Sequence, residues 1–338
     1  MRARTLASTL STVVLMAVAP FVIAPAAAAP AGAEGTAAAR VEGIDKHTDR
    51  QWDVNVYSPS MGRAIPLQVI RPADTSAPRP TLYLLNGAGG GEDGADWENQ
   101  TDIVELFADK NVNVVIPAAG IFSYYTDWQK VDPKLGVAHM WQTFLTKELP
   151  PVIDKALGTN KVNSIGGLSM SAGSVLDLAI QAPGLYKGVA SYSGCARTSD
   201  PVGQAYIRTV VEVMGGANTT NMWGPYDGPA WREHDPYLNA EKLRGLSIYI
   251  STGNGLPGVH EDPNAPRNPK SPPLADQVAI GGVIEAATNQ CTRQLADRLR
   301  ELNIPATVDF RPNGTHSWGY WQEDLRKSLP QLSASLGI

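Results

Sequence analysis

An alternation of short apolar runs with longer helical patterns is the feature of this sequence that most constrains its fold. The apolar runs favour strands, predicted at 52–57, 64–70, 81–85, 112–117, 162–168, 188–193, 246–252 and 306–310. Helical periodicity lies between and after the later runs, at 102–109, 140–156, 174–182, 202–214, 280–302 and 320–336. This alternation predicts an α/β fold with a mostly parallel, doubly wound sheet and helices on both faces. Because no helix separates the first two strands, we expect an antiparallel edge there.

The length of the chain and its two irregular segments predict the domain organisation. With 338 residues, 43% of them hydrophobic, the chain is long enough to bury a large core. We predict a single α/β domain over residues 41–338, with insertions at about 195–245 and 254–278. Both insertions follow the carboxyl ends of predicted strands, where open α/β sheets place their ligand crevice. We therefore expect them to form walls of an active site.

The N-terminus has the layout of a secretory signal peptide. Arg2 and Arg4 precede an apolar stretch at 6–23, which leads into alanine-rich residues suited to cleavage. A transmembrane anchor is the alternative, but the apolar stretch is short and interrupted by proline. We predict a signal peptide at 1–29, a flexible mature N-terminus at 30–40, and a secreted protein that is extracellular or associated with the cell wall.

Charge and cysteine content narrow the possible partners. The formal net charge is −5 without any block of like charges, so a nucleic-acid partner is not expected. Cys195 and Cys291 are the two cysteines, and an exported pair tends to be oxidised. We predict a disulfide between these residues, which are 96 positions apart. Such a bond lowers the conformational entropy of the unfolded chain, which corresponds to about 4–5 kcal/mol of stabilisation. Two free buried thiols are the alternative. Metal ligand spacing is missing from the sequence, so no metal is expected.

Ser169 is the strongest candidate for a chemical role. It follows the predicted strand at 162–168, precedes the helical pattern at 174–182, and is flanked by small residues. A nucleophilic serine at a sharp strand-to-helix turn needs such neighbours, usually as G-x-S-x-G. Here the fifth position is Ser171. The sequence therefore predicts a nucleophile at Ser169, and a tight turn with an ordinary surface serine is the alternative.

The base and the acid of a serine hydrolase should lie on loops near the C-terminus. His316 is the one histidine after the last predicted strand, and a turn histidine bonded to backbone is the alternative. The acid is left open by the residues alone: Glu261 and Asp262 follow the strand at 246–252, whereas Glu285 begins a long helix. The acid would fix the imidazole tautomer and stabilise the imidazolium. His47, His139, His234 and His260 are the other histidines, and they are weaker candidates for the base.

An oxyanion hole requires two backbone N–H groups directed at the developing charge. One is expected from Met170, directly after the serine. The second is expected from the loop at 86–91, which reads Asn-Gly-Ala-Gly-Gly-Gly and lets backbone approach a substrate closely. A phosphate-binding loop is the alternative, but neither the full G-x-G-x-x-G pattern nor a following Lys-Ser/Thr is present. No cofactor is therefore expected.

Several motifs in one order resemble the secreted mycolyltransferases, the antigen 85 family. They are Tyr-Tyr-Thr-Asp-Trp at 124–128, Trp-Gln-Thr-Phe-Leu-Thr-Lys-Glu-Leu-Pro at 141–150, Gly-Leu-Ser-Met-Ser at 167–171, Met-Trp-Gly-Pro at 222–225, Pro-Ala-Trp at 229–231, Gly-Asn-Gly at 253–255 and Asn-Gly-Thr-His-Ser-Trp at 313–318. The resemblance covers about residues 82 to 321. It implies an α/β-hydrolase fold and a serine acyl-enzyme. The implied reaction moves a mycolyl group from trehalose monomycolate to a second trehalose monomycolate or to cell-wall arabinogalactan.

The resemblance also implies roles for individual residues. Ser169 matches the nucleophile of the family and His316 its base, and the family's acidic motif favours Glu285 over Glu261. The oxyanion amides would come from Ala88 and Met170. The residues expected to contact the substrate are Asn86, Gly87, Gly89, Trp97, Ser317 and Trp318. Tryptophans such as Trp97, Trp223 and Trp318 are also common core residues.

The sequence departs from the mycobacterial pattern in two places. Asn86-Gly87-Ala88-Gly89 stands where those members carry Asp-Gly-Leu-Arg, and Thr252 replaces a cysteine. The glycine-rich loop is more similar to the corynebacterial-type branch, which handles shorter mycolates. Two other functions stay open: a secreted carboxylesterase with water as acceptor, and a surface protein that binds a host matrix protein.

Overall fold

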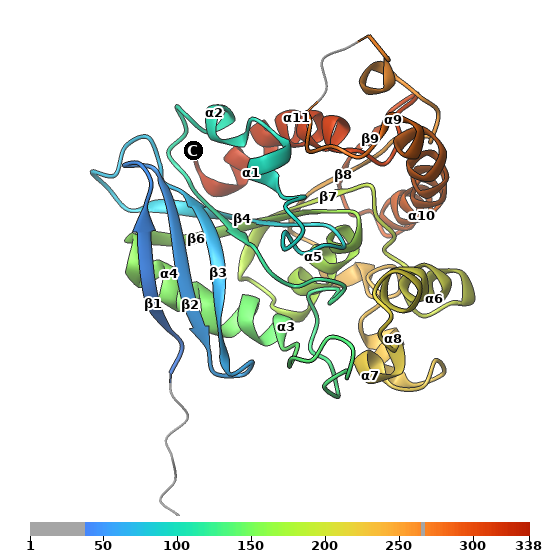
Figure 1. Cartoon of the computed structure of the whole chain (residues 1–338), viewed down its shortest axis with the longest axis horizontal. Helices are drawn as coiled ribbons and strands as arrows, with labels where there is room; N and C mark the ends of the chain where they lie inside the picture. The colour runs from blue at the N-terminus through green and yellow to red at the C-terminus, as the bar shows by residue number, and fades with distance from the viewer. Residues whose placement is uncertain (1–37, 265–267) are drawn as a thin grey trace, which may run out of the picture. The chain divides into compact units, whose positions relative to one another are not determined.

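The computed structural model describes residues 38–264 and 268–338, and Ala38–Ile338 form one compact unit (Figure 1). The predicted signal peptide at 1–29 lies outside the described residues, as does the predicted flexible N-terminus up to residue 37. Arg40, the last residue of that predicted segment, instead begins the first strand.

The described residues form a nine-stranded sheet with the order β1-β2-β3-β5-β4-β6-β7-β8-β9. The strands are β1 Arg40–Lys46, β2 Gln51–Ser58, β3 Arg63–Ile70, β4 Arg79–Leu85, β5 Asn113–Pro117, β6 Thr159–Leu168, β7 Tyr186–Tyr192, β8 Ser247–Thr252 and β9 Thr307–Phe310. Strands β4 to β9 pair in parallel, whereas β1, β2, β3 and β5 pair antiparallel along one edge. The mostly parallel sheet and its antiparallel edge confirm the sequence prediction.

Strand β1 is the one strand of the described chain that the sequence analysis did not predict. Its side chains are largely exposed, because it pairs with β2 on one side and forms the edge of the sheet. An edge strand with one free side needs no continuous apolar run. The apolar signal used for the other strands is therefore absent from β1.

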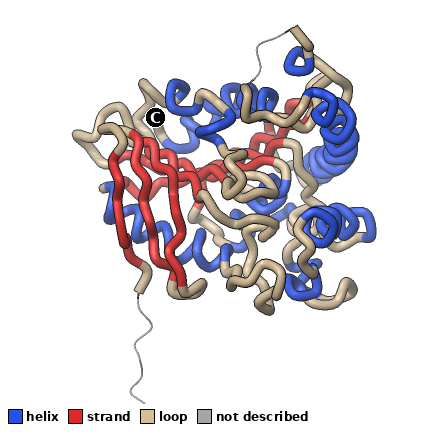
Figure 2. The backbone as a smooth tube through the Cα atoms, viewed as in Figure 1, coloured by secondary structure: helices blue, strands red, loops and turns tan. Residues whose placement is uncertain are grey.

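Helices cover both faces of the sheet, as Figure 2 shows. On one face, the core joins the sheet to α4 Leu149–Leu157, α5 Met170–Gln181 and α10 Gly282–Glu301. On the other face, it joins the sheet to α1 Trp97–Gln100, α2 Ile103–Leu106 and α11 Trp318–Leu336. The strands that carry the site are therefore buried on both sides, which explains their apolar sequences.

Most predicted helices are present, with different ends. The pattern at 140–156 forms α3 Trp141–Thr143, the π-turn η1 Phe144–Glu148 and α4. The pattern at 202–214 forms α6 Pro201–Arg208 and η2 Thr209–Met214. The predicted helix at 102–109 is reduced to the four residues of α2. Short helical turns complete the described chain: α7 Thr219–Trp223, α8 Pro229–Glu233, η3 Ala240–Leu243, η4 Val259–Glu261, α9 Leu274–Asp276 and η5 Gln277–Gly281.

The insertion at about 195–245 has a small core of its own. This core contains Ile207, Val211, Met222, Trp223 and Trp231, which pack together with Trp128.

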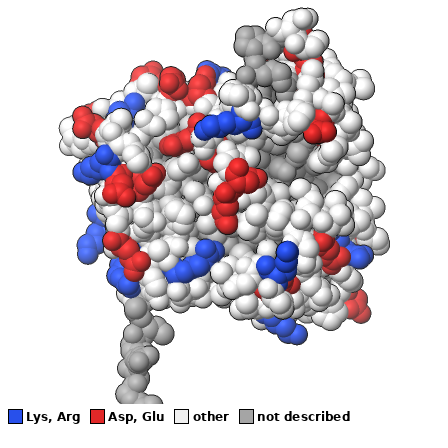
Figure 3. All heavy atoms as spheres, in the orientation of Figure 1, with Lys and Arg blue, Asp and Glu red and all other residues white. Residues whose placement is uncertain are grey.

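Across the described ranges, the helices are all too short or too polar to cross a membrane. On the visible face of the molecule, Lys and Arg are interspersed with Asp and Glu (Figure 3), in agreement with the modest net charge.

Candidate active site

Ser169 lies at a sharp turn between β6 and α5. Its backbone has φ 55° and ψ −119°, a left-handed region that a residue other than glycine adopts only under constraint. The Ser169 N–H donates to the Tyr192 carbonyl of the neighbouring strand at 2.9 Å. A Cβ on Gly167 would lie 2.6 Å from Ser171 Oγ, so glycine is required there. The strained serine predicted from the sequence is present.

Ser171 explains why the fifth position of the motif is not glycine. Its hydroxyl accepts from the Leu168 N–H at 2.9 Å and lies 3.2 Å from the Leu85 carbonyl oxygen, to which it donates. The side chain is completely buried. Ser171 therefore ties the end of β4 to the turn that carries Ser169.

His316 lies between Ser169 and Glu285. Its Nε2 is 2.7 Å from Ser169 Oγ, and its Nδ1 is 2.8 Å from Glu285 Oε2. His316 lies on the loop after β9, and the backbone N–H of His316 donates to the Gly281 carbonyl at 3.1 Å. The indole of Trp321 meets the imidazole edge to face, with ring centres 4.8 Å apart. These contacts fix the imidazole in the line from hydroxyl to carboxylate.

Glu285 is completely buried at the start of α10. Its Oε1 accepts from Ser193 Oγ at 2.8 Å, Thr252 Oγ1 at 3.0 Å and the Gly253 N–H at 2.5 Å. Burial by itself would raise the pKa of Glu285, but the hydrogen bond and charge of His316 lead the effects that lower it below the ordinary value. The carboxylate is therefore ionised at neutral pH and faces the imidazole.

Glu261, the competing candidate for the acid, supports the His316 loop from below. Its Oε1 accepts from Thr315 Oγ1 at 2.6 Å, and its Oε2 accepts from Tyr320 Oη at 2.6 Å. These bonds hold the residue before His316 and the first turn of α11. The structure thus places Glu285, and not Glu261 or the exposed Asp262, against the imidazole.

The other histidines are bonded away from Ser169. His47 contacts Asp53, His234 contacts Asp177 and His260 contacts Glu323, each at 2.7–2.8 Å. His139 accepts from Trp141 Nε1 at 3.1 Å. Among the described residues, His316 is the histidine that reaches the Ser169 hydroxyl.

A cavity of about 490 Å³ opens beside Ser169 and His316 at the carboxyl ends of the strands. Its floor includes Gly87, Ala88 and Met170. The apolar walls of the cavity come from α6 and η2 and from α10. Figure 1 shows α6 and α10 near each other on one side of the molecule. The main wall residues are Tyr206, Ile207, Val210, Met214, Val283 and Ile284. The first insertion therefore forms a wall as expected, whereas the described part of the second does not line the cavity.

The loop at 86–91 passes close to the nucleophile. A Cβ on Gly87 would lie 3.9 Å from Ser169 Oγ and 3.1 Å from Leu168 Cδ1. The absence of a side chain at Gly87 therefore leaves room for a reacting group above the serine. Ala88 and Met170 line the same cavity.

Two of the residues expected to contact the substrate, Asn86 and Trp97, have completely buried side chains that do not line the cavity. The amide of Asn86 donates to the Pro117 carbonyl at 3.0 Å and accepts from the Trp97 N–H at 3.3 Å. Trp97 donates from Nε1 to the Leu85 carbonyl at 3.1 Å and packs edge to face on Trp318. Both residues shape the loop from beneath and do not reach the cavity.

The remaining expected contacts divide in the same way. Gly87, Gly89 and Trp318 line the cavity. Ser317 is buried beside Thr315 and Glu261 and does not line the cavity. A side chain next to a cavity residue in sequence can point the opposite way, as Ser317 does beside Trp318.

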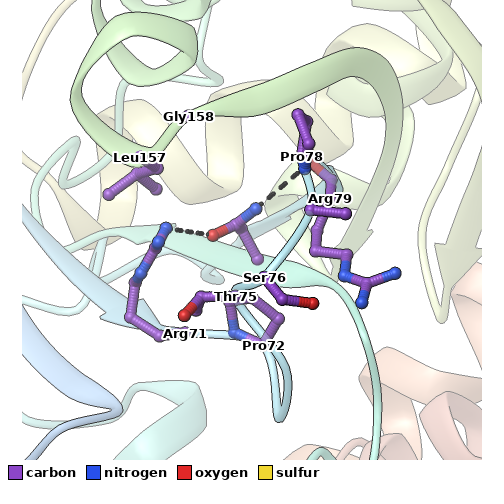
Figure 4. Close-up of a pocket in the computed structure, with 10 residues that line it drawn as sticks. Arg71, Pro72, Thr75, Ser76, Pro78, Arg79, Leu157 and Gly158 are labelled. Atoms are coloured by element: carbon purple, nitrogen blue, oxygen red, sulfur yellow. Dashed lines mark hydrogen bonds between the residues drawn. The ribbon is translucent and has the colours of Figure 1, made fainter.

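A second, smaller cavity of about 210 Å³ lies near the amino end of β4, away from Ser169 (Figure 4). Arg71 and Arg79 line it, and Arg71 Nη1 donates to Asn113 Oδ1 at 2.5 Å. None of the predicted site residues lines this cavity. Within residues 38–264 and 268–338, His, Cys, Asp and Glu side chains nowhere gather in threes as metal ligands would.

The predicted disulfide between Cys195 and Cys291 is present, with the Cα atoms 5.0 Å apart. It joins the loop after β7 to α10, the helix whose first turn carries the Glu285 carboxylate.

Ser193 and Thr252, which donate hydrogen bonds to the Glu285 carboxylate, were missed by the sequence analysis. Their only local signal is a position at or just after the end of a buried strand.

The comparisons with known proteins show the family of this chain. Residues 58–332 match the model of a family described as "Putative esterase". Ag85A of Mycobacterium tuberculosis, a diacylglycerol acyltransferase/mycolyltransferase, is 32% identical over 292 residues, covering 84% of this chain and 81% of the relative. Ag85B of Mycobacterium avium, with the same activities in its name, is 30% identical over 290 residues, covering 84% and 83%.

Solved structures support the fold. The chain is similar to MPT51 (FbpC1) of Mycobacterium tuberculosis with a TM-score of 0.71 and 24% identity, covering 86% of this chain and all of that one. An S-formylglutathione hydrolase from Agrobacterium tumefaciens has a TM-score of 0.58 and 16% identity, covering 88% and 99%. The mostly parallel sheet with helices on both faces is thus an α/β-hydrolase fold.

Proposed function

We propose that this chain transfers a mycolyl group from trehalose monomycolate to a sugar hydroxyl. The chain belongs to the esterase family and, within it, to the family of the Ag85 mycolyltransferases. The observation that carries the proposal is the chain of hydrogen bonds from Ser169 through His316 to Glu285. Ser169 and His316 line an apolar cavity.

In the first step, Ser169 Oγ attacks the ester carbonyl of the donor while His316 Nε2 accepts the hydroxyl proton. The negative charge on the carbonyl oxygen would be stabilised by the N–H groups of Ala88 and Met170. Collapse of this intermediate breaks the bond to the sugar oxygen, and His316 returns the proton to the departing trehalose. An acyl-Ser169 enzyme remains.

In the second step, a sugar hydroxyl takes the place that trehalose has left. His316 accepts its proton as the oxygen attacks the acyl-Ser169 ester, and the proton then returns to Ser169. The ionised Glu285 stabilises the imidazolium in both steps. With a second trehalose monomycolate as acceptor the product is the dimycolate, and with cell-wall arabinogalactan it is an esterified glycan.

The lining of the cavity supports a long acyl group as substrate. The helices α6, η2 and α10 present Ile207, Val210, Val283 and Ile284 to the same cavity. Burial of hydrocarbon against such walls contributes about 25 cal/mol per Å² of apolar area removed from water. Gly87, Gly89 and Trp318 line the cavity together with Ser169 and are proposed to contact the sugar.

The place of action follows from the same proposal. Trehalose mycolates and arabinogalactan are envelope components, so we propose that the mature protein is secreted and acts at the cell envelope. The disulfide between Cys195 and Cys291 is typical of exported proteins and supports this location. Binding of a host matrix protein stays a prediction.

Product analysis tests the proposed reaction. Purified mature protein is incubated with trehalose monomycolate, and the lipids are identified by mass spectrometry. Dimycolate together with free trehalose is the expected result. Free mycolic acid as the sole acyl product would identify a carboxylesterase with water as acceptor, and would contradict the proposal.

A further inference from the structure

A line of buried charged groups continues beyond Glu285, on the side away from His316. Arg311 directly follows β9, and its side chain is 4% exposed. Its Nη2 donates to Glu285 Oε1 at 3.0 Å, and its Nη1 donates to the Asp324 carboxylate of α11. Asp324 is completely buried. One guanidinium therefore bridges two buried carboxylates, and one of these contacts His316.

The orientation of the guanidinium is set by these two carboxylates. Arg311 Nε is buried and has no hydrogen-bond partner among the described residues, whereas both terminal nitrogens contact carboxylate oxygens. A guanidinium remains charged under all ordinary conditions and presents its donors in a rigid plane. The side chain thus adds a charged donor to the three neutral donors that hold Glu285 Oε1.

The charges of this cluster change during the proposed reaction. With neutral His316, the cluster holds two carboxylates and one guanidinium, a net charge of −1. When His316 accepts the proton of Ser169, the net charge becomes zero. Without Arg311, the buried Asp324 and Glu285 carboxylates would lose the cation between them, and the pKa of Glu285 would rise because the charge of Arg311 helps to lower it. A protonated Glu285 would no longer stabilise the imidazolium.

We propose that Arg311 is a positioning residue for acyl transfer, which keeps Glu285 ionised and directed at His316, and that Asp324 holds Arg311 in place. This inference rests on the proposed function only in needing an acyl-enzyme at Ser169. It is therefore tested with hydrolysis of a short p-nitrophenyl ester, which needs the serine but no mycolyl donor.

The first variant is Arg311→Met, which keeps the length of the side chain and removes its charge. We expect kcat to fall about 10- to 100-fold with KM nearly unchanged, less than the roughly 10⁴-fold loss caused by misdirecting the imidazole itself. The charged groups that face Glu285 are His316, Arg311 and Asp324. Because the charge of Arg311 helps to lower the pKa of Glu285, activity should also be lost at a higher pH on acidification.

The second variant, Arg311→Met combined with Asp324→Leu, separates positioning from charge balance. It removes both members of the buried pair, so no uncompensated Asp324 charge is left to unfold the protein. The remaining cluster again has a net charge of −1, so we expect thermal stability and the pH profile to recover toward wild type. We expect kcat to stay below wild type, because Glu285 still lacks the guanidinium donor. If Arg311→Met alone fails to fold, the double variant carries the test.

Arg71→Met is the matched control. Arg71 is also buried, 8% exposed, and contacts Asn113 near the smaller cavity, away from the site (Figure 4). We expect its kcat and pH profile to equal those of the wild type. Recovery of wild-type kcat in the double variant, or an Arg311→Met enzyme with unchanged kcat and pH profile, would overturn the proposal.

The two proposals fail in different ways. Wild-type ester hydrolysis without dimycolate formation contradicts mycolyl transfer, while the role of Arg311 is still measured on the short ester. A folded wild-type enzyme that forms neither p-nitrophenol from the ester nor dimycolate from trehalose monomycolate would overturn both proposals.

Discussion

His316 Nε2 lies 2.7 Å from Ser169 Oγ, although 147 positions separate the two residues in the chain. The sheet brings them together, because β6 and β9 end at the same edge and their loops meet above it. The third residue, Glu285, reaches the imidazole from the start of α10. The chemistry proposed for this chain depends on this convergence.

Replacement of Glu285 tests the acid. Glu285→Gln removes the charge that stabilises the imidazolium, and we expect kcat for ester hydrolysis to fall by up to roughly 10⁴-fold. Glu261→Gln is the matched control, since Glu261 is also a buried carboxylate near the His316 loop but contacts Thr315 and Tyr320. Its kcat should fall less than tenfold. Equal losses in the two variants would contradict the assignment of Glu285.

Gly167 tests the packing of the turn. In Gly167→Ala the new Cβ would lie 2.6 Å from Ser171 Oγ and 2.9 Å from the Ser171 carbonyl oxygen. We expect a loss of about 1–3 kcal/mol in the free energy of unfolding, as for other overpacked sites. In Gly43→Ala the nearest atom is 4.0 Å away, and urea unfolding should show a change below about 0.5 kcal/mol. An unchanged unfolding curve for Gly167→Ala would refute this account of the turn.

The disulfide is expected to stabilise the whole domain. Its cysteines are 96 positions apart, and loss of such a bond typically costs about 2–5 kcal/mol. The paired substitution Cys195→Ser with Cys291→Ser should lower the free energy of unfolding by that amount in urea. Reduction of the wild-type protein serves as the control, since it should shift the midpoint in the same direction. If the double variant and the reduced protein both unfold at the midpoint of the oxidised wild type, the bond adds no stability.

Asp324 predicts a pH dependence of stability. Burial is the main reason that its pKa is raised from 3.8 to about 6. A carboxyl with a raised folded-state pKa stabilises the protein while it is protonated, and this contribution is lost as the pH rises from 3.8 to about 6. Asp324→Asn should therefore show a weaker decrease in unfolding free energy across this window. Parallel curves for the two proteins would argue against a raised pKa.

The parts of the site that have a local sequence signal could be predicted. Ser169 was identified because its turn requires small neighbours, and His316 because it follows the last strand. The choice between Glu285 and Glu261 needed the family resemblance, because both carboxylates are buried within contact of the same loop. Only the direction of the His316 ring separates them, and residue spacing does not encode it.

The features of the site that the sequence did not indicate have a common physical origin. Asn86 and Trp97 were expected at the substrate, yet their polar atoms are bonded to backbone beneath the loop and their surfaces are fully buried. Whether a polar or aromatic side chain next to a cavity faces it depends on packing between distant elements. Arg311 and Asp324 escaped notice for the same reason, since they meet Glu285 only in the folded chain.

The most direct test of the central claim is the mass of the serine-containing peptide during turnover. Wild-type protein and Ser169→Ala are mixed with trehalose monomycolate, quenched in acid and digested, and the peptides are analysed by mass spectrometry. The account predicts a mycolyl adduct on Ser169 in the wild type, and neither adduct nor dimycolate in the folded Ser169→Ala protein. An adduct on another residue, or dimycolate formed by Ser169→Ala, would contradict it.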